Sequence, residues 1–212
     1  RRPTGAQSRA FYRDPLYHWP NFRVFLAELD LTTADYLLDV GCGGGALLRA
    51  VLESGCRAAA IDHSYDMVQL ASAENREAIA AGRLTIQQAD AERLPFGDDS
   101  FTRAVMTGVL GHLPDPVAVF RELRRVLAPG GRLIALGSDP ELRGTPAAPE
   151  PAASRLRFYD DAKFLALATA AGFSDARVER RDLEEHARAS GVPEEHLDLF
   201  RGPARFLFAR KD

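Results

Sequence analysis

Short apolar runs alternate along this chain with longer segments in which apolar residues recur at helical spacing. From about residue 36 onward the alternation predicts strands separated by helices, an order typical of an α/β fold with a parallel sheet and helices on both faces. The expected strands are 36–40, 57–61, 83–88, one that ends at Thr107, 132–137, 177–181 and 204–209. The expected helices are 46–54, 64–81, one that Pro114–Pro116 opens and that runs to Ala128, and 160–171.

Three segments fall outside this alternation, and they are 11–30, 139–157 and 182–202. The first carries apolar residues at helical spacing from Phe22 to Leu29, which predicts one helix after an aromatic-rich approach. The second is rich in proline and glycine, which predicts a mobile loop. The third is longer than a hairpin requires, so we expect one or two short helices there, one of them starting at Pro193.

The first apolar run ends in a glycine-rich turn, Gly41-Cys42-Gly43-Gly44-Gly45. Glycines let the backbone come close to a ligand, and the start of the next helix offers unpaired N–H donors. Asp39 lies just before the first glycine, while Asp62 and Asp90 follow the next two strands. Strands of an open parallel sheet present their carboxyl ends at one ligand-binding edge. We therefore expect a nucleotide-type pocket with acids around it.

A dinucleotide site is the alternative to weigh, because Gly41-x-Gly43-x-x-Ala46 fits the permissive dinucleotide fingerprint and Asp62 lies about 20 residues further on. The acidic residues disfavour a dinucleotide site, because a carboxylate at Asp39 would repel a pyrophosphate bound beside the turn. They favour a cationic ligand. An NAD-dependent oxidoreductase nevertheless stays open as an alternative function.

Five segments follow one another in a characteristic order, and they are Leu38–Gly45, Ile61–Ser64, Ala89–Phe96, Gly108–Asp115 and Arg125–Leu133. Together they resemble the motifs of class I S-adenosylmethionine-dependent methyltransferases, in particular small-molecule enzymes similar to the ubiquinone and menaquinone biosynthesis methyltransferases. The resemblance extends from about Tyr36 to Phe173. It implies a Rossmann-like, doubly wound sheet of seven mostly parallel strands with an antiparallel last strand, helices on both faces and an N-terminal helical lid.

The resemblance implies S-adenosyl-L-methionine as cofactor and assigns contacts with it to Asp39, Gly41, Cys42, Gly43, Asp62, His63, Met67, Asp90, Ala91 and Thr107. The glycine turn would contact the methionine moiety, with Asp39 orienting its ammonium group. Asp62 would accept hydrogen bonds from both ribose hydroxyls, although a strand-terminal turn residue is the alternative. Thr107 would line the sulfonium side.

The same resemblance places the adenine between His63 and Met67. Asp90 would accept a hydrogen bond from the adenine amino group, and the backbone N–H of Ala91 would donate one. A plain core methionine is an equally open interpretation of Met67.

His112 follows the fourth strand on the expected substrate side, and its ordinary pKa suits a general base, so it is the candidate catalytic residue. The alternative is that it caps or packs the helix that follows. Tyr12, Tyr17 and His18 are further candidates on the N-terminal lid. Trp19 and its aromatic neighbours either wall an apolar acceptor pocket or dock the helix.

A chain of 212 residues, 46% hydrophobic and 27% charged, has the size and composition of one globular domain. We expect a single methyltransferase domain over 1–212, with a helical lid at 1–30 and the Rossmann-like core at 36–212. The formal net charge of −3 disfavours nucleic acid as a partner. The arginines of segment 121–125 predict a solvated helix face.

The chain has only two cysteines, Cys42 and Cys56, and they are too differently placed to form a disulfide framework or a metal site. No His/Cys/Asp cluster has ligand spacing, so no metal is expected. No apolar run approaches the ~20 residues of a membrane span. We therefore expect a cytoplasmic protein without membrane or nucleic-acid partners, whose oligomeric state the sequence leaves open.

The expected function is transfer of a methyl group from S-adenosylmethionine to O, N or C of a small organic acceptor, such as a secondary metabolite. Besides the oxidoreductase, one further alternative is a protein that binds S-adenosylmethionine without methylating anything. Fold inference does not decide between these functions.

Overall fold

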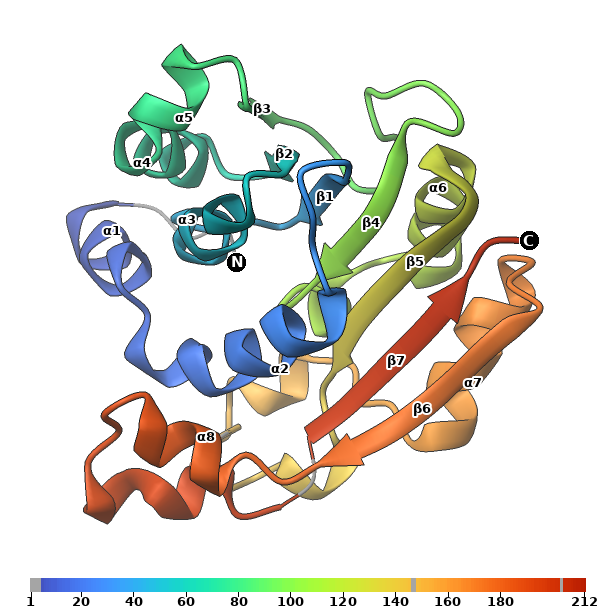
Figure 1. Ribbon diagram of the computed structural model, residues 1–212. Coiled ribbons are helices and arrows are strands. Elements are labelled where there is room, and N and C mark those ends of the chain that lie inside the picture. The colour runs from blue at the N-terminus through green and yellow to red at the C-terminus, as the bar shows by residue number, and fades with distance from the viewer. Residues whose placement is uncertain (1–4, 146–147, 203) are drawn as a thin grey trace.

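A seven-stranded sheet forms the centre of the computed structural model, which describes residues 5–145, 148–202 and 204–212 (Figure 1). The strands are β1 (Tyr36–Val40), β2 (Arg57–Asp62), β3 (Leu84–Gln88), β4 (Phe101–Met106), β5 (Leu127–Gly137), β6 (Asp175–Arg181) and β7 (Ala204–Arg210). Their spatial order is β3-β2-β1-β4-β5-β7-β6, and β7 runs antiparallel to both of its neighbours while the other pairs are parallel. The expected mostly parallel sheet with an antiparallel last strand is confirmed.

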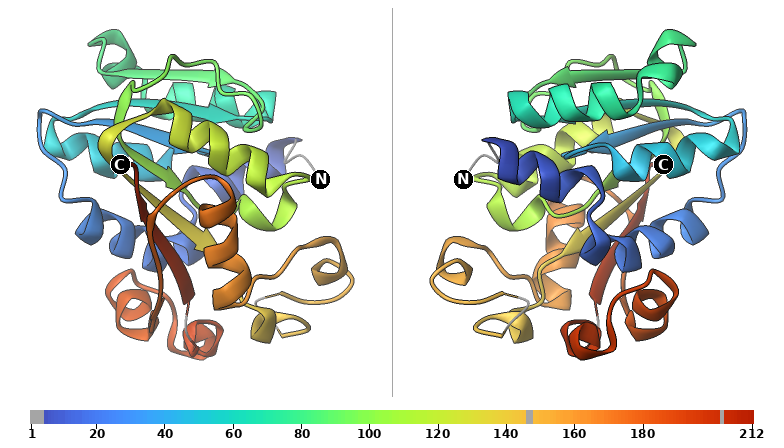
Figure 2. Two further views of the ribbon diagram at one scale, coloured as in Figure 1. Left: turned by 90° about the vertical axis from the view of Figure 1, so that its right-hand side faces the viewer. Right: turned by 90° about the vertical axis from the view of Figure 1, so that its left-hand side faces the viewer.

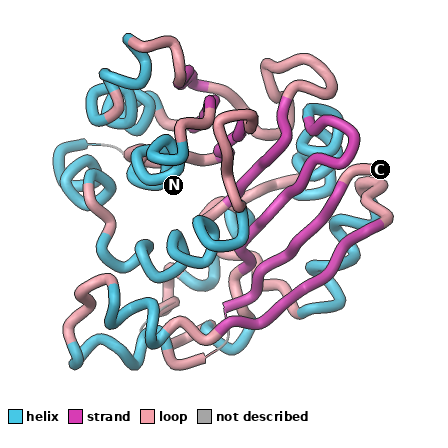
Figure 3. Tube along the Cα trace, viewed as in Figure 1, coloured by secondary structure: helices cyan, strands magenta, loops and turns pink. Residues whose placement is uncertain are grey.

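Helices cover both faces of the sheet, as expected. They are α1 (Gly5–Arg13), α2 (Trp19–Leu29), α3 (Ala46–Val51), α4 (Tyr65–Glu74), α5 (Arg76–Ala80), α6 (Pro116–Val126), α7 (Asp161–Ala170) and α8 (Glu184–Ala189). One core cluster joins the sheet to α2, α3 and α8, and a second joins it to α6 and α7. Figure 2 shows these two layers from opposite sides, and Figure 3 shows the strands between them. None of the described helices is long and apolar enough to cross a membrane.

The N-terminal segment contains two helices where the sequence predicted one. α1 ends at Arg13, a 3-10 turn spans Leu16–His18, and α2 begins at Trp19. Pro15 explains the break, because a proline disfavours helical geometry in the residue before it. The aromatic-rich approach is therefore itself helical and lies as a separate element beside α4.

The predicted helix 64–81 is interrupted at Asn75, so that α4 and α5 are separate. The Asn75 side chain is buried, and its Nδ2 donates to the carbonyl oxygen of Ala71 at 2.9 Å and to that of Gly45 at 3.3 Å. Side-chain hydrogen bonds of this kind compete with the helical backbone ladder. The break thus ties the helix to the glycine-rich turn.

Strand β5 begins at Leu127, earlier than the expected 132–137, because Leu127 already pairs with Phe101 of β4, and the segment Pro129-Gly130-Gly131 forms an irregularity within the strand. The register shifts between Phe101 and Arg103, and Gly130 has a φ of 78°. A glycine accommodates the left-handed conformation that such an irregularity requires.

The two long connections also contain local structure. Segment 139–157 holds 3-10 turns at Pro140–Leu142 and Ala153–Arg155, and its expected mobility stays a prediction. Segment 182–202 holds α8 and a 3-10 helix, Glu194–Phe200, whose first flanking residue is Pro193. The expectation of one or two short helices there is confirmed.

Candidate functional site

The glycine-rich turn between β1 and α3 forms the floor of the candidate site. The backbone N–H groups of Gly41 and Cys42 both donate to the carbonyl oxygen of Ile61, at 2.8 and 3.0 Å. Gly41 has a φ of 81°, and a Cβ atom there would overlap with the Val109 side chain. The turn is therefore bound to the end of β2 on one side and closed by the segment after β4 on the other.

Asp62 ends β2 and accepts hydrogen bonds from this turn. Its Oδ2 accepts from the backbone N–H of Gly43 at 3.0 Å, and its Oδ1 accepts from that of Ser64 at 2.8 Å. Nδ1 of His63 lies 3.3 Å from the same Oδ1. Asp62 is only 6% exposed, so the turn and two further residues hold its carboxylate in one orientation.

Asp39 lies in β1, 1% exposed, and its Oδ1 has no hydrogen-bond partner among the described residues. Burial, and then the charge of Asp62, raise the pKa of Asp39 to about 7. Burial and both carboxylates also raise the pKa of the Cys42 thiol. Because burial without partners disfavours a negative charge, a cation bound here would stabilise the ionised Asp39.

The expected cofactor residues after β3, Asp90 and Ala91, differ in how far they are buried. The β3 end joins the site through the Ala89 N–H, which donates to the carbonyl oxygen of Asp62 at 3.2 Å. Asp90 itself is exposed, and its Oδ1 accepts from the backbone N–H of Glu92 at 3.0 Å. Ala91 is half-buried against the α6 side of the core. Two carboxylates are thus brought together within the fold, while the third caps a turn at its rim.

Met67 lies in the first turn of α4 and is fully buried, which suits both a core side chain and an adenine contact. Thr107 follows β4 directly and is half-buried. The β4 residue before it, Met106, pairs with Val40, so Thr107 and Gly41 leave neighbouring strands at the same edge.

His112 is exposed at the end of a 3-10 turn, Leu110–His112, after β4. Its backbone N–H donates to the carbonyl oxygen of Val109 at 2.9 Å. Partial burial lowers the pKa of His112 below its ordinary value. The imidazole is therefore predominantly neutral at neutral pH and has a free nitrogen lone pair for accepting a proton.

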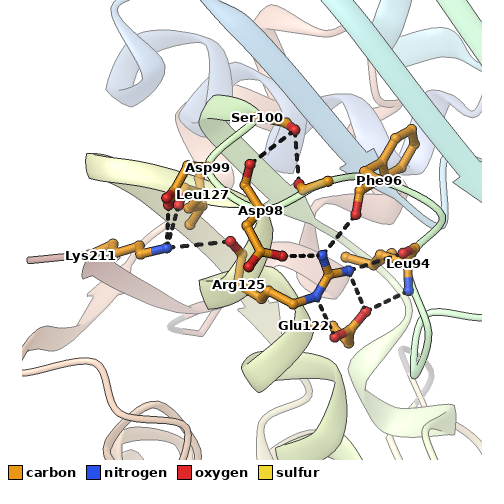
Figure 4. Close-up of polar contacts among 10 residues, drawn as sticks. Leu94, Phe96, Asp98, Asp99, Ser100, Glu122, Arg125, Leu127 and Lys211 are labelled. Carbon is orange, nitrogen blue, oxygen red and sulfur yellow. Dashed lines mark hydrogen bonds and ion pairs between the residues drawn. The ribbon is translucent and has the colours of Figure 1, made fainter.

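An arginine clip holds the segment after β3 against α6 (Figure 4). Arg125 forms hydrogen bonds with both carboxylate oxygens of Glu122, at 2.8 Å each. It also donates to the carbonyl oxygens of Phe96 and Leu94, at 2.8 and 3.0 Å, and to Asp98 Oδ1 at 2.8 Å. The expectation of a merely solvated helix face is wrong for Arg125, because the folded chain brings carbonyl groups of a distant loop to its guanidinium.

Tyr12 of α1, which the sequence indicated only as a lid candidate, packs on the glycine-rich turn. A Cβ atom on Gly43 would lie 3.2 Å from its ring, and one on Gly44 would overlap with its carbonyl oxygen. Burial raises the pKa of the Tyr12 phenol, and the charge of Asp62 raises it further. Because α1 is remote in sequence, its docking on the turn left no local signal.

Asn75 also packs on the turn, and the sequence did not single it out. A Cβ atom on Gly45 would lie 2.5 Å from its Nδ2, so the amide packs directly on the turn. A polar residue inside an apolar helix pattern is the signal that could have found it. Within the described part of the chain, no group of three or more His, Cys, Asp or Glu side chains is arranged to hold a metal ion.

Known proteins are similar to this chain in sequence and in fold. Residues 38–135 match a family described as methyltransferase domain. The chain is 38% identical over 130 residues to 27-O-demethylrifamycin SV methyltransferase of Amycolatopsis mediterranei (strain S699), an alignment that covers 61% of this chain and 47% of that protein. It is 35% identical over 122 residues to ubiquinone biosynthesis O-methyltransferase of Xanthomonas oryzae pv. oryzae (strain PXO99A), covering 58% of this chain and 48% of that protein. The chain spans about half the length of the curated relatives it matches.

A solved structure, that of the cyclase SpnF, has the same fold with a TM-score of 0.70 and 24% sequence identity. The match covers 91% of this chain and 81% of the other. At this identity the likeness concerns the fold alone. The matched segment and the two relatives show that this chain is similar to methyltransferases, and the order of its strands is that of a Rossmann-like sheet.

Proposed function

We propose that the chain is an S-adenosylmethionine-dependent methyltransferase that transfers a methyl group to O, N or C of a small organic acceptor, such as a secondary metabolite. The observation that carries the proposal is the buried Asp39, whose Oδ1 has no hydrogen-bond partner among the described residues and whose pKa is raised to about 7 by burial and by the charge of Asp62. The amino group of the cofactor is a cation that this carboxyl can bind. A pyrophosphate in the same place would face two carboxylates.

Asp62 has the bonding capacity for the ribose. Each of its carboxylate oxygens accepts one backbone N–H, from Gly43 and from Ser64, which leaves lone pairs for two ribose hydroxyls. Because both bonds fix the carboxylate, little further ordering is needed on binding. His63, Met67, Asp90, Ala91 and Thr107 would complete the cofactor site as the family resemblance implies.

The bound cofactor supplies a methyl group that is already activated by the positive sulfonium. The chain has to align donor and acceptor, and good alignment of two reactants contributes roughly 7–11 kcal/mol to lowering a barrier. His112 would take the proton of the acceptor, because its lowered pKa keeps the imidazole neutral.

α1 would act as a lid over the cofactor. Arg9 lies 3.5 Å from Asp66, and Arg13 lies 3.0 Å from Glu74, both across to α4. Exposed ion pairs of this kind contribute little, typically up to about 1 kcal/mol each. A helix held in this way can leave and return at low cost, which suits entry of a ligand onto the turn beneath Tyr12.

Calorimetry with S-adenosylhomocysteine and, separately, NAD tests the cofactor. We expect binding of S-adenosylhomocysteine, and at least tenfold weaker binding by Asp62→Ala, equal to about 1.4 kcal/mol. The matched control is Asp198→Ala, which removes a carboxylate that is 74% exposed in the 3-10 helix Glu194–Phe200. Binding of NAD without S-adenosylhomocysteine would establish the oxidoreductase alternative instead.

Incubation with methyl-labelled cofactor and a broad acceptor panel tests the transfer itself. We expect label in an organic acceptor and release of S-adenosylhomocysteine. Cofactor binding with no labelled product across the panel would favour the protein that binds without methylating, an alternative that the fold by itself does not decide.

A further inference from the structure

A cavity of about 260 Å³ lies at the opposite edge of the sheet from the glycine-rich turn. It is bounded by the end of α2, the middle of β5, the start of β6, the last residues of β7, and β4. Figure 1 shows that the ends of β5 and β7 nearest the C-terminus extend beyond α2, which crosses the same face of the sheet. This cavity takes no part in the proposed methyl transfer.

Three arginines form one row across neighbouring strands at this cavity. Arg103 of β4 pairs in register with Arg132 of β5, and Arg132 pairs with Arg210 of β7. Side chains of register partners project from the same face of a sheet, and like charges directly opposite each other are destabilising. Repulsion within the row therefore lowers the stability of the folded protein.

Two of the cavity's arginines have partners within the protein. Arg103 lies 3.1 Å from Asp35 and donates to the carbonyl oxygen of Leu29 at 3.2 Å. Arg177 lies 2.7 Å from Glu179. These charges are thus largely offset by local acids.

Arg132 and Arg210 are different, because neither side chain has a hydrogen bond or ion pair in the part of the chain that the structure describes. Of the two acids at the cavity, Glu28 lies 2.8 Å from Arg181 and is already paired. Asp175 is the register partner of Arg210 and has no ion pair among the described residues. It offsets at most one of the two free guanidinium charges.

We propose that this cavity is a second ligand site, which binds a small phosphate-bearing anion through Arg132 and Arg210. Planar guanidinium groups present paired donors that match the oxygens of phosphate, and a dianion would relieve the repulsion between the two neighbours. Phe208 supplies an apolar wall, with the guanidinium carbon of Arg177 4.6 Å from its ring centroid. A cavity of this volume suits a small phosphate ester rather than a polymer.

Titration of the full chain with inorganic pyrophosphate, against sodium chloride of equal ionic strength, tests the site by calorimetry and thermal unfolding. We expect pyrophosphate to raise the unfolding temperature, and Arg132→Gln and Arg210→Gln each to weaken its binding at least tenfold. The matched control is Arg121→Gln on α6, at the other face of the sheet, which should bind as the wild type does. Without ligand, Arg132→Gln should unfold at the same or a higher temperature, since it removes a repulsion, and this shows that the lost binding is not lost folding.

Saturating S-adenosylhomocysteine separates this site from the proposed cofactor site, because pyrophosphate binding at the arginines should not change. AMP provides a second arm, where tighter binding than pyrophosphate indicates that the organic part of a phosphate ester is also recognised, and equal or weaker binding indicates recognition of the phosphate group alone. The proposal is overturned if pyrophosphate acts no differently from chloride. It is equally overturned if S-adenosylhomocysteine displaces the anion, or if Arg121→Gln loses as much affinity as Arg132→Gln.

Discussion

Asp39 is a buried carboxyl group, and no residue in the part of the chain that the structure describes forms a hydrogen bond with its Oδ1. It lies in β1 between β2 and β4 and is 1% exposed, and no basic side chain among the described residues pairs with it. Buried polar groups are usually hydrogen-bonded, and exceptions concentrate where a ligand completes the site. At the scale of single residues, this is the feature that most directly links the structure to the proposed function.

Asp39→Asn tests the raised pKa through stability. The folded pKa of about 7 lies above the ordinary carboxyl value of 3.8, so the stability of the wild type is greatest below the lower value and falls as pH rises through the higher one. Between about pH 5 and pH 8 the wild type should lose about 2–3 kcal/mol that the variant keeps. Urea unfolding of both proteins at the two pH values measures this, and an equal change in both would show that Asp39 is not the group.

His112→Gln tests the candidate base. Because the pKa of His112 lies below its ordinary 6.5, the rate of methyl transfer by the wild type should rise with pH below 6.5 and then stay level. The variant should be slower by about a hundredfold or more and lack this pH dependence, with cofactor affinity unchanged. If the variant retains the wild-type rate and profile, His112 serves only to end its 3-10 turn.

At the scale of elements, distant segments hold the glycine-rich turn and the loop after β3 in place. Asn75 connects the α4–α5 break to Gly45, and Tyr12 of α1 packs on Gly43. Arg125 of α6 binds carbonyl oxygens of the loop that carries Asp90 (Figure 4). The site is thus positioned by contacts between elements rather than by the turn alone.

Arg125→Ala tests the clip. The change removes the Arg125 donors from two carbonyl oxygens and from the Glu122 carboxylate, which keeps the backbone N–H of Leu94, so we expect a loss of about 1–3 kcal/mol of unfolding free energy. Arg121→Ala, an exposed neighbour on the same helix, should change it by less than about 0.5 kcal/mol. Equal effects of the two substitutions in denaturant titrations would mean that the clip does not stabilise the loop.

At the scale of the whole molecule, the sheet separates two apolar layers. Phe25 of α2 is fully buried on one face, where it meets Phe206 of β7 edge-on with ring centroids 5.5 Å apart. Phe120 of α6 is fully buried on the other face. The sheet is therefore packed against an apolar layer on each of its two faces.

Truncation in each layer should therefore be costly and independent. Phe25→Ala and Phe120→Ala should each lower the unfolding free energy by about 3–5 kcal/mol. Because the sheet lies between them and they share no contact cluster, the double variant should add the two losses to within about 0.5 kcal/mol. Denaturant unfolding of the single and double variants measures this, and a strongly non-additive result would indicate coupling through the sheet.

Local sequence pattern was sufficient for the elements that are buried on both sides. β1 occupies 36–40 as predicted, because a short run of mainly apolar residues is typical of a strand that is buried on both faces. The pattern was insufficient at the α4–α5 break and at the start of β5, since an asparagine amide and a neighbouring strand there outweigh helical spacing. The separate α1 helix was missed because its docking contacts lie far away in the chain.

The sequence by itself determined the alternation of strands and helices, the glycine turn, and the acids that follow the first strands, because each depends on residues within about one element of one another. Only the tertiary structure decided which charged groups are left without partners. Asp39 became an unpaired buried carboxyl, Asp90 an exposed turn cap, Arg125 a clip, and Arg132 with Arg210 a like-charged pair. The physical reason is that the free energy of a charge depends on its burial and on its neighbours in space, and these are set by the whole fold.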